Sequence, residues 1–192
     1  MRISGGIAKG RRTATKRLLI KKANGEKLRP TSSKVREAIF DILGSRIKGA
    51  SFVDLYAGTG TVGFEALSRG ADMAVFVESD SMRIQAIKNI ANELGFLEKS
   101  VIRKGRASEF LKKAASENRI FDIFFVDPPY RSAELEKVLP LIGEGGLLSE
   151  GGIVVAEHFS REKPPDAEGR LRKEKAYRYG DTTLTLYRKV EA

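Results

Sequence analysis

An apolar run that ends in a glycine-rich loop constrains this chain more than any other feature. Residues 52–63, FVDLYAGTGTVG, join a strand-like segment to a G-x-G-x-x-G loop and the start of a helical pattern. Gly58 and Gly60 lack a Cβ atom, so the backbone can turn tightly there and approach a ligand closely. The order of strand, loop and helix predicts an α/β unit that binds its ligand at the helix N-terminus.

Apolar strands alternate with helical patterns from residue 51 onward, which indicates a mostly parallel sheet covered on both faces. Further strands are predicted at 73–77, 101–102, 121–126 and 153–156, and helices at 81–94, 108–115 and 133–142. Five glycines between 143 and 152 predict a mobile connection before the fifth strand. The segments 176–179 and 183–187, around the turn Gly180-Asp181, predict a terminal antiparallel hairpin.

The positive charge is concentrated at the N-terminus. Residues 1–36 hold 12 Lys and Arg against one acidic residue, whereas the rest of the chain holds 23 basic and 24 acidic residues. The Asn24-Gly25 turn signal predicts a small β-hairpin arm over residues 1–29. By composition such an arm is either a solvated tail or a phosphate-binding element, and RNA or DNA suits it better than a membrane surface.

A second motif, Asp127-Pro128-Pro129-Tyr130, follows the fourth predicted strand. Its two prolines fix φ and remove two N–H donors, which leaves rigid carbonyls at the strand end. Ligands of open α/β sheets bind beyond the carboxyl ends of the strands, so Gly58, Gly60, Glu78 and Asp127 are expected to line one crevice. Glu78 can accept hydrogen bonds from ribose hydroxyls of NAD or of S-adenosylmethionine (SAM), so it does not separate these cofactors.

Together, the glycine loop and the Asp-Pro-Pro-Tyr motif resemble SAM-dependent methyltransferases that modify exocyclic amines of nucleobases. Leu28-Arg29-Pro30-Thr31, Val35-Arg36-Glu37 and Phe40 extend the resemblance to RsmD-type enzymes. Those enzymes methylate N2 of a guanine in bacterial small-subunit (16S) ribosomal RNA. The resemblance covers nearly the whole chain, including Gly5-Gly6 and residues 179–182.

The resemblance implies a Rossmann-like methyltransferase fold with a mostly parallel seven-stranded sheet, a C-terminal antiparallel hairpin and an N-terminal β-hairpin extension. It divides the chain into a basic RNA-docking arm, residues 1–29, and a methyltransferase domain, residues 30–192. SAM is the implied cofactor. Ribosomal RNA, within an assembled or partly assembled small subunit, is the implied partner.

The resemblance also implies three sets of site residues. The catalytic set is Asp127, Pro128, Pro129 and Tyr130. The cofactor set is Asp54, Tyr56, Gly58, Gly60, Glu78, Ser79, Arg106, Ala107 and Asp127. The RNA-binding set is Arg2, Lys9, Arg11, Arg12, Lys16, Arg17, Arg29 and Arg36. In the methyl transfer that the resemblance implies, the Asp127 carboxylate and the Pro128 carbonyl accept hydrogen bonds from the exocyclic amine of the guanine, and Tyr130 stacks on the guanine ring.

Three other functions fit part of the sequence. An NAD-dependent oxidoreductase fits the glycine loop, but a chain of 192 residues leaves no room for a separate substrate domain. A non-enzymatic RNA-binding assembly factor fits the basic arm. An adenine-N6 or cytosine-N4 methyltransferase fits the Asp-Pro-Pro-Tyr motif.

The absence of cysteine excludes a thiolate metal site and a cysteine-adduct pyrimidine methyltransferase, and it suits a reducing cytoplasm. We expect no metal, and we expect the single histidine, His158, to have a structural or surface role and not to bind a metal or act in catalysis. The sequence has no signal peptide and no apolar run of membrane length.

Overall fold

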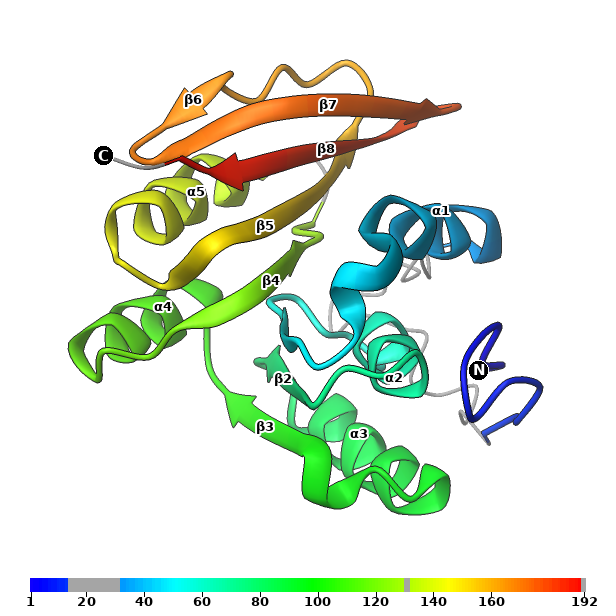
Figure 1. The fold of residues 1–192 in the computed structure, drawn as a ribbon. Helices are drawn as coiled ribbons and strands as arrows, with labels where there is room; N and C mark the ends of the chain where they lie inside the picture. Colours follow the sequence, from blue (N-terminus) through cyan, green and yellow to red (C-terminus); the bar gives the residue numbers. More distant parts are fainter. Residues whose placement is uncertain (14–31, 130–131, 191–192) are drawn as a thin grey trace.

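The computed structural model describes residues 1–13, 32–129 and 132–190 (Figure 1). In this part of the chain one eight-stranded sheet has the order β3-β2-β1-β4-β5-β8-β7-β6. The parallel strands are β1 (Ser51–Asp54), β2 (Met73–Glu78), β3 (Ser100–Lys104), β4 (Phe121–Val126) and β5 (Leu148–Phe159). The antiparallel strands are β8 (Thr182–Lys189), β7 (Leu171–Tyr179) and β6 (Ala167–Glu168).

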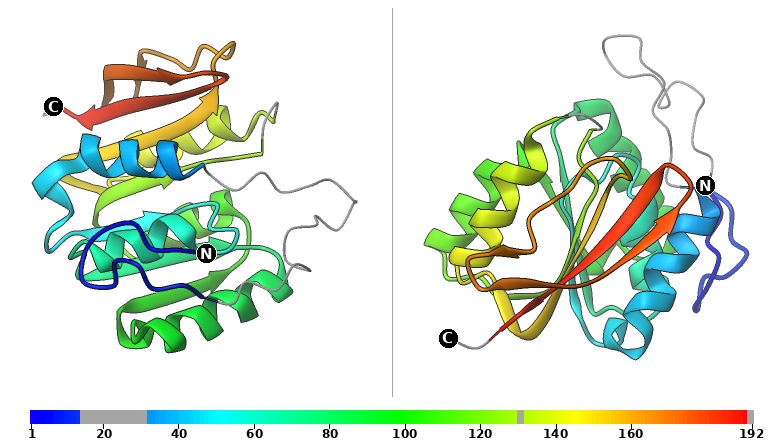
Figure 2. Two further views of the ribbon diagram at one scale, coloured as in Figure 1. Left: turned by 90° about the vertical axis from the view of Figure 1, so that its right-hand side faces the viewer. Right: turned by 90° about the horizontal axis from the view of Figure 1, so that it is seen from above.

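Helices cover both faces of the sheet, as the view from above in Figure 2 shows. One face carries α1 (Ser33–Leu43), α2 (Thr61–Ser68) and α3 (Ser81–Leu94). The other face carries α4 (Ala107–Ser116) and α5 (Glu134–Glu144). Two short 3-10 segments, η2 (Gly44–Ile47) and η3 (Leu97–Lys99), lead into β1 and β3.

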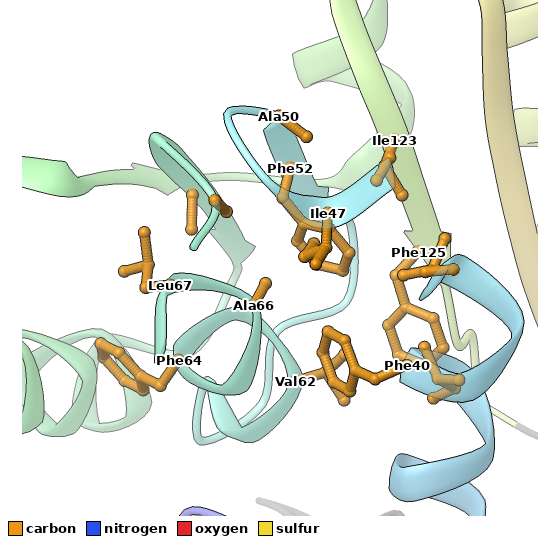
Figure 3. Close-up of a cluster of buried hydrophobic side chains, with 14 of the residues drawn as sticks. Phe40, Ile47, Ala50, Phe52, Val62, Phe64, Ala66, Leu67, Ile123 and Phe125 are labelled. Atoms are coloured by element: carbon orange, nitrogen blue, oxygen red, sulfur yellow. The ribbon is translucent and has the colours of Figure 1, made fainter. Parts of the chain in front are cut away.

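Strand side chains alternate between two cores, one under each helical layer. In β1, Phe52 packs toward α1 and α2, whereas Val53 packs toward α4 and α5. Figure 3 shows Phe40 of α1 beside Phe52 and Phe125, and the Phe40 and Phe52 ring centroids are 6.5 Å apart. These buried rings hold α1 against the sheet, because each large aromatic side chain removes much apolar surface from water.

Helix boundaries follow polar caps that the sequence supplies. The Ser32 hydroxyl accepts a hydrogen bond from the backbone N–H of Val35 and begins α1. The Asp80 carboxylate accepts one from Arg83 and begins α3, and Gly95, at φ 74°, ends it. The helix predicted at 81–94 is therefore confirmed over the same residues.

Two predictions about the C-terminal half were wrong. The expected mobile connection at 143–152 is largely regular structure, since α5 extends to Glu144 and β5 begins at Leu148. The reason is burial, because Leu147 and Leu148 are buried and the Leu147 carbonyl accepts a hydrogen bond from Phe121. The sheet also has eight strands instead of seven, because the two residues of β6 pair with the start of β7.

The first 13 residues fold into a hairpin-like segment along α2 (Figure 1). Arg2 and Arg12 form an antiparallel bridge, and Ile3 is buried in the core between this segment and the helices. This part of the expected N-terminal extension is confirmed as folded structure, whereas the Asn24-Gly25 turn lies outside the described residues. No helix in the described ranges is both long and apolar enough to cross a bilayer.

Candidate active site

Loops from neighbouring strands meet at the carboxyl edge of the sheet. Gly58 and Gly60 lie in the loop after β1 and have φ values of 55° and 74°, a region that favours glycine. A Cβ atom on Gly60 would lie 2.8 Å from the Phe64 ring, and one on Gly63 would lie 2.3 Å from the Phe76 ring. A Cβ atom on Gly58 would meet nothing within 4 Å. Gly60 and Gly63 therefore allow close packing of α2, whereas Gly58 borders open space.

Glu78, at the end of β2, holds this loop in place. Its Oε2 accepts a hydrogen bond from the Gly58 N–H at 2.9 Å. Its Oε1 accepts bonds from the Ser79 and Asp80 N–H groups, both at 2.8 Å. Oε2 also lies 3.6 Å from Arg83 Nη1, so a ligand hydroxyl that donates to the second lone pair of Oε2 would do so beside this cation.

Asp54 supports the loop from below. This residue is buried, and its Oδ2 accepts a hydrogen bond from the Gly63 N–H at 3.1 Å. The contact caps α2, whose N-cap residue, Gly60, has no side chain to do so. Burial, as the largest cause, raises the pKa of Asp54 to about 7. The structure therefore assigns Asp54 to the support of the glycine loop.

The remaining expected cofactor residues lie around the same edge. The Tyr56 hydroxyl donates to Glu134 Oε2 at 3.2 Å and joins the loop to α5, and burial raises the pKa of this phenol. Arg106 is exposed and Ala107 buried at the start of α4. The Gly105 N–H donates to the Glu78 carbonyl at 3.1 Å, which fixes that start beside the end of β2.

Asp127 follows β4 and lies near two other acidic residues. Its pKa is raised well above its usual range, first by burial and then by the negative charges of Glu157 and Asp54. Glu157 is a buried residue of β5, next to the registered pair Val126 and Ala156. Strand alternation directs all three carboxyl groups toward the layer of α1, α2 and α3.

The two prolines of the Asp-Pro-Pro-Tyr motif differ in their surroundings. The Pro129 carbonyl accepts hydrogen bonds from the Ser132 N–H at 3.2 Å and the Ser132 hydroxyl at 2.6 Å. Pro128 is buried and Pro129 is exposed. Tyr130 lies outside the described residues.

The basic residues that were predicted to bind RNA and that the structure describes separate into two groups. Arg2, Lys9 and Arg12 are exposed on the N-terminal segment. Two others have intramolecular partners, because Arg11 donates to the Leu94 and Glu93 carbonyls and Arg36 is buried against Glu65. Lys16, Arg17 and Arg29 lie outside the described residues.

His158 occupies a buried position in β5. Its Nε2 lies 2.8 Å from the Thr185 hydroxyl and its Nδ1 lies 3.0 Å from the Phe159 carbonyl. Burial lowers the pKa of His158, which favours the neutral ring. These contacts support a structural histidine. Within the described ranges no group of three or more His, Asp or Glu side chains is arranged to hold a metal ion.

A family model described as Conserved hypothetical protein 95 matches residues 1–188. The chain belongs to this family. YlbH of Bacillus subtilis is 35% identical over 189 residues, which are 98% of this chain and 99% of YlbH. The Escherichia coli protein named ribosomal RNA small subunit methyltransferase D is 35% identical over 158 residues, 82% of this chain and 74% of that protein.

The structure of Escherichia coli yhhF has a TM-score of 0.80 and 29% identity, over 98% of this chain and 97% of yhhF. These relatives confirm the resemblance to RsmD-type enzymes and the Rossmann-like fold. Sequence reasoning missed Glu157 and Glu134. An acidic residue directly after the predicted strand 153–156 was the available signal for Glu157.

Proposed function

We propose that this chain transfers a methyl group from SAM to the exocyclic N2 amine of a guanine in 16S ribosomal RNA. The observation that carries the proposal is the Asp127 carboxyl group, which follows β4, the strand that pairs with β1 and so lies next to the glycine loop that Glu78 holds. The name of the Escherichia coli relative supports ribosomal RNA of the small subunit as the substrate. We further propose that the reaction takes place in the cytoplasm.

The residues at the carboxyl edge fit SAM. Glu78 Oε2 has a second lone pair, beside the Arg83 guanidinium, that can accept a hydrogen bond from a ribose hydroxyl, and Gly58 borders open space that a ligand could approach. The backbone at Ala107 is suited to the adenine, because Gly105 fixes this turn beside Glu78. When bound, SAM supplies a methyl group that its sulfonium already activates, so the protein must mainly orient the acceptor.

Asp127 and Pro128 orient and activate the amine. The lone pair of a guanine N2 amine is delocalised into the ring, which makes the nitrogen a poor nucleophile. Hydrogen bonds from its N–H groups to the Asp127 carboxylate and the Pro128 carbonyl hold the nitrogen toward tetrahedral geometry. In its ionised form Asp127 is a stronger base because its pKa is raised, so an Oδ atom can take the proton that the amine loses as the N–CH3 bond forms and the S–CH3 bond breaks.

The exposed cations of the N-terminal segment, Arg2, Lys9 and Arg12, supply phosphate contacts for the RNA. Such contacts are largely independent of sequence. Selection of the guanine then depends on the shape of the RNA and on the pocket around Asp127. An assembled or partly assembled small subunit suits this mode of recognition, because it presents the RNA in one defined shape.

Methyl transfer to three substrates in parallel tests the proposal: unmodified small subunits, naked 16S ribosomal RNA and DNA. Mass spectrometry of the digested product identifies the modified nucleoside, and Asp127→Ala serves as the inactive control. We expect N2-methylguanosine in ribosomal RNA. N6-methyladenosine or N4-methylcytidine would contradict the target, and RNA binding without methyl transfer would favour an assembly factor.

A further inference from the structure

Glu65 lies in the second half of α2, away from the proposed methyl-transfer site, and its side chain is fully buried. Both oxygens have partners from the N-terminal segment. Oε2 accepts a hydrogen bond from the Ser4 N–H at 2.9 Å, and Oε1 accepts one from the Ser4 hydroxyl at 2.8 Å. A buried carboxylate without compensation is costly, so these contacts strongly favour the docked segment.

Two cations complete this cluster. Arg69 Nε donates to Glu65 Oε1 at 2.9 Å, and Arg36 Nε lies 3.6 Å from Glu65 Oε2. Arg36 also donates to the Arg2 carbonyl at 3.2 Å. One carboxylate thus joins α1, α2 and the N-terminal segment, and it takes Arg36 out of the set of cations available to RNA.

The next turn of the segment docks on the end of α2. The Ser68 hydroxyl donates to the Gly5 carbonyl at 2.6 Å and accepts from the Ala8 N–H at 2.9 Å. The Ile7 N–H donates to the Ser68 carbonyl at 2.8 Å. Gly6 has a φ of 74°, and a Cβ atom there would lie 1.7 Å from the same carbonyl oxygen. Only glycine fits this close approach.

The contacts with α2 define the direction in which the N-terminal segment runs along this helix. Ile7 contacts the last residue of α2, whereas Ser4 contacts Glu65, three residues nearer the glycine loop. The first residues of the segment and Thr13 therefore lie toward the N-terminal end of α2, where the glycine loop is. Thr13 is tied there by a hydrogen bond from its N–H to the Met1 carbonyl at 3.0 Å.

We infer that Glu65 is a positioning residue for RNA binding, which fixes the N-terminal segment on α2 so that Arg2, Lys9 and Arg12 present one ordered set of charges to the phosphate backbone. The inference rests on the proposed function, because it takes ribosomal RNA as the ligand. Ordering before binding raises affinity, since the entropy cost of fixing the segment is met during folding. Glu65 acts through the segment and does not touch the cofactor loop.

Gly6→Ala is the cleanest perturbation, because it displaces the segment and leaves every side chain of α2 intact. Gly10→Ala is the matched control, since Gly10 has a similar φ of 85° but a Cβ atom there meets nothing within 4 Å. We expect Gly6→Ala to raise the RNA KM at least about tenfold, with kcat and the SAM Kd within twofold of wild type. Gly10→Ala should change the RNA KM much less.

Glu65→Gln tests the carboxylate itself, because the amide keeps the size but loses the charge and one acceptor. We expect the same rise in RNA KM and a shallower dependence of log Kd on log salt, as fewer phosphate contacts form together. In the double variant the effects of Gly6→Ala and Glu65→Gln should not add, because both act by undocking one segment.

Filter binding of labelled 16S ribosomal RNA separates this inference from the proposed function, because it needs no turnover. If the wild type methylates none of the substrates but Gly6→Ala still binds RNA more weakly than the wild type, the proposed methyl transfer is rejected and the positioning role of Glu65 is kept. Unchanged RNA Kd and salt dependence in Gly6→Ala would overturn the inference. A parallel loss of SAM affinity, kcat and RNA affinity would also overturn it, since that pattern reports general damage to the fold.

Discussion

Replacing Asp54 with asparagine should make the protein more stable at neutral and alkaline pH. The folded protein raises the pKa of this carboxyl group from 3.8 to about 7, mainly by burial. The stability that a neutral Asp54 provides is therefore complete below about pH 4 and is lost as the pH rises through 7. The amide in Asp54→Asn never ionises and can still accept the Gly63 N–H bond.

The size of the effect follows from the pKa difference. At about 1.4 kcal/mol for each pKa unit, ionisation of Asp54 costs the folded protein about 4 kcal/mol in total. By pH 5 the wild type has already lost roughly 1.7 kcal/mol of stability through this ionisation. The stability of Asp54→Asn relative to the wild type should therefore grow by about 2.5 kcal/mol between pH 5 and pH 8. Urea denaturation of both proteins without cofactor, at pH 5, 6, 7 and 8, measures the two free energies of unfolding. A difference that stays constant across this range would refute the account of a buried, neutral Asp54.

Three further predictions concern the methyl-transfer site. Asp127→Ala should lower kcat by about 10²–10⁴-fold in the methyl-transfer assay, and Asp127→Asn should retain part of the activity, because its amide oxygen can still accept a hydrogen bond; wild-type turnover by the alanine variant would contradict the mechanism. Glu157→Gln should move the acidic limb of the kcat/KM profile to lower pH, since loss of the neighbouring negative charge lowers the pKa of Asp127; an unmoved limb would show that this limb does not report Asp127. Glu78→Ala should weaken SAM binding by about 10–100-fold in calorimetry, because an unsatisfied N–H group in the Gly58 loop and a lost ribose contact each cost about 1–3 kcal/mol; unchanged affinity would remove Glu78 from the cofactor site.

Local patterns were enough to predict the strands and helices that carry the site. β4 spans Phe121–Val126 as predicted, because a strand buried on both faces reads as a continuous apolar run. β5 was harder, since Gly151 and Gly152 interrupt its first half and hide the buried residues before them. Glycine marks a loop when only neighbours in sequence are considered, whereas Leu148 pairs with Phe121 of β4 and Ile153 pairs with Ile123, with a shift of register between the two pairs.

Contacts between distant residues limited the prediction of individual side chains. Arg36 carries the same charge as Arg2 and Arg12, and its partner Glu65 lies 29 residues further along the chain. Charge counting cannot separate a buried ion pair from a phosphate contact. Glu157 was missed for a related reason, because its proximity to Asp127 depends on the register between β4 and β5.

The contact between Ser4 and Glu65 also has a consequence for biosynthesis, because the two residues are 61 positions apart. At about 5–20 residues per second, translation takes roughly 3–12 seconds to reach Glu65 after Ser4 has been made. During that interval the basic N-terminal segment has no helix to dock on, because α2 follows it in the chain. Its hairpin-like form on α2 is therefore a late product of folding, which must wait until α2 itself has emerged.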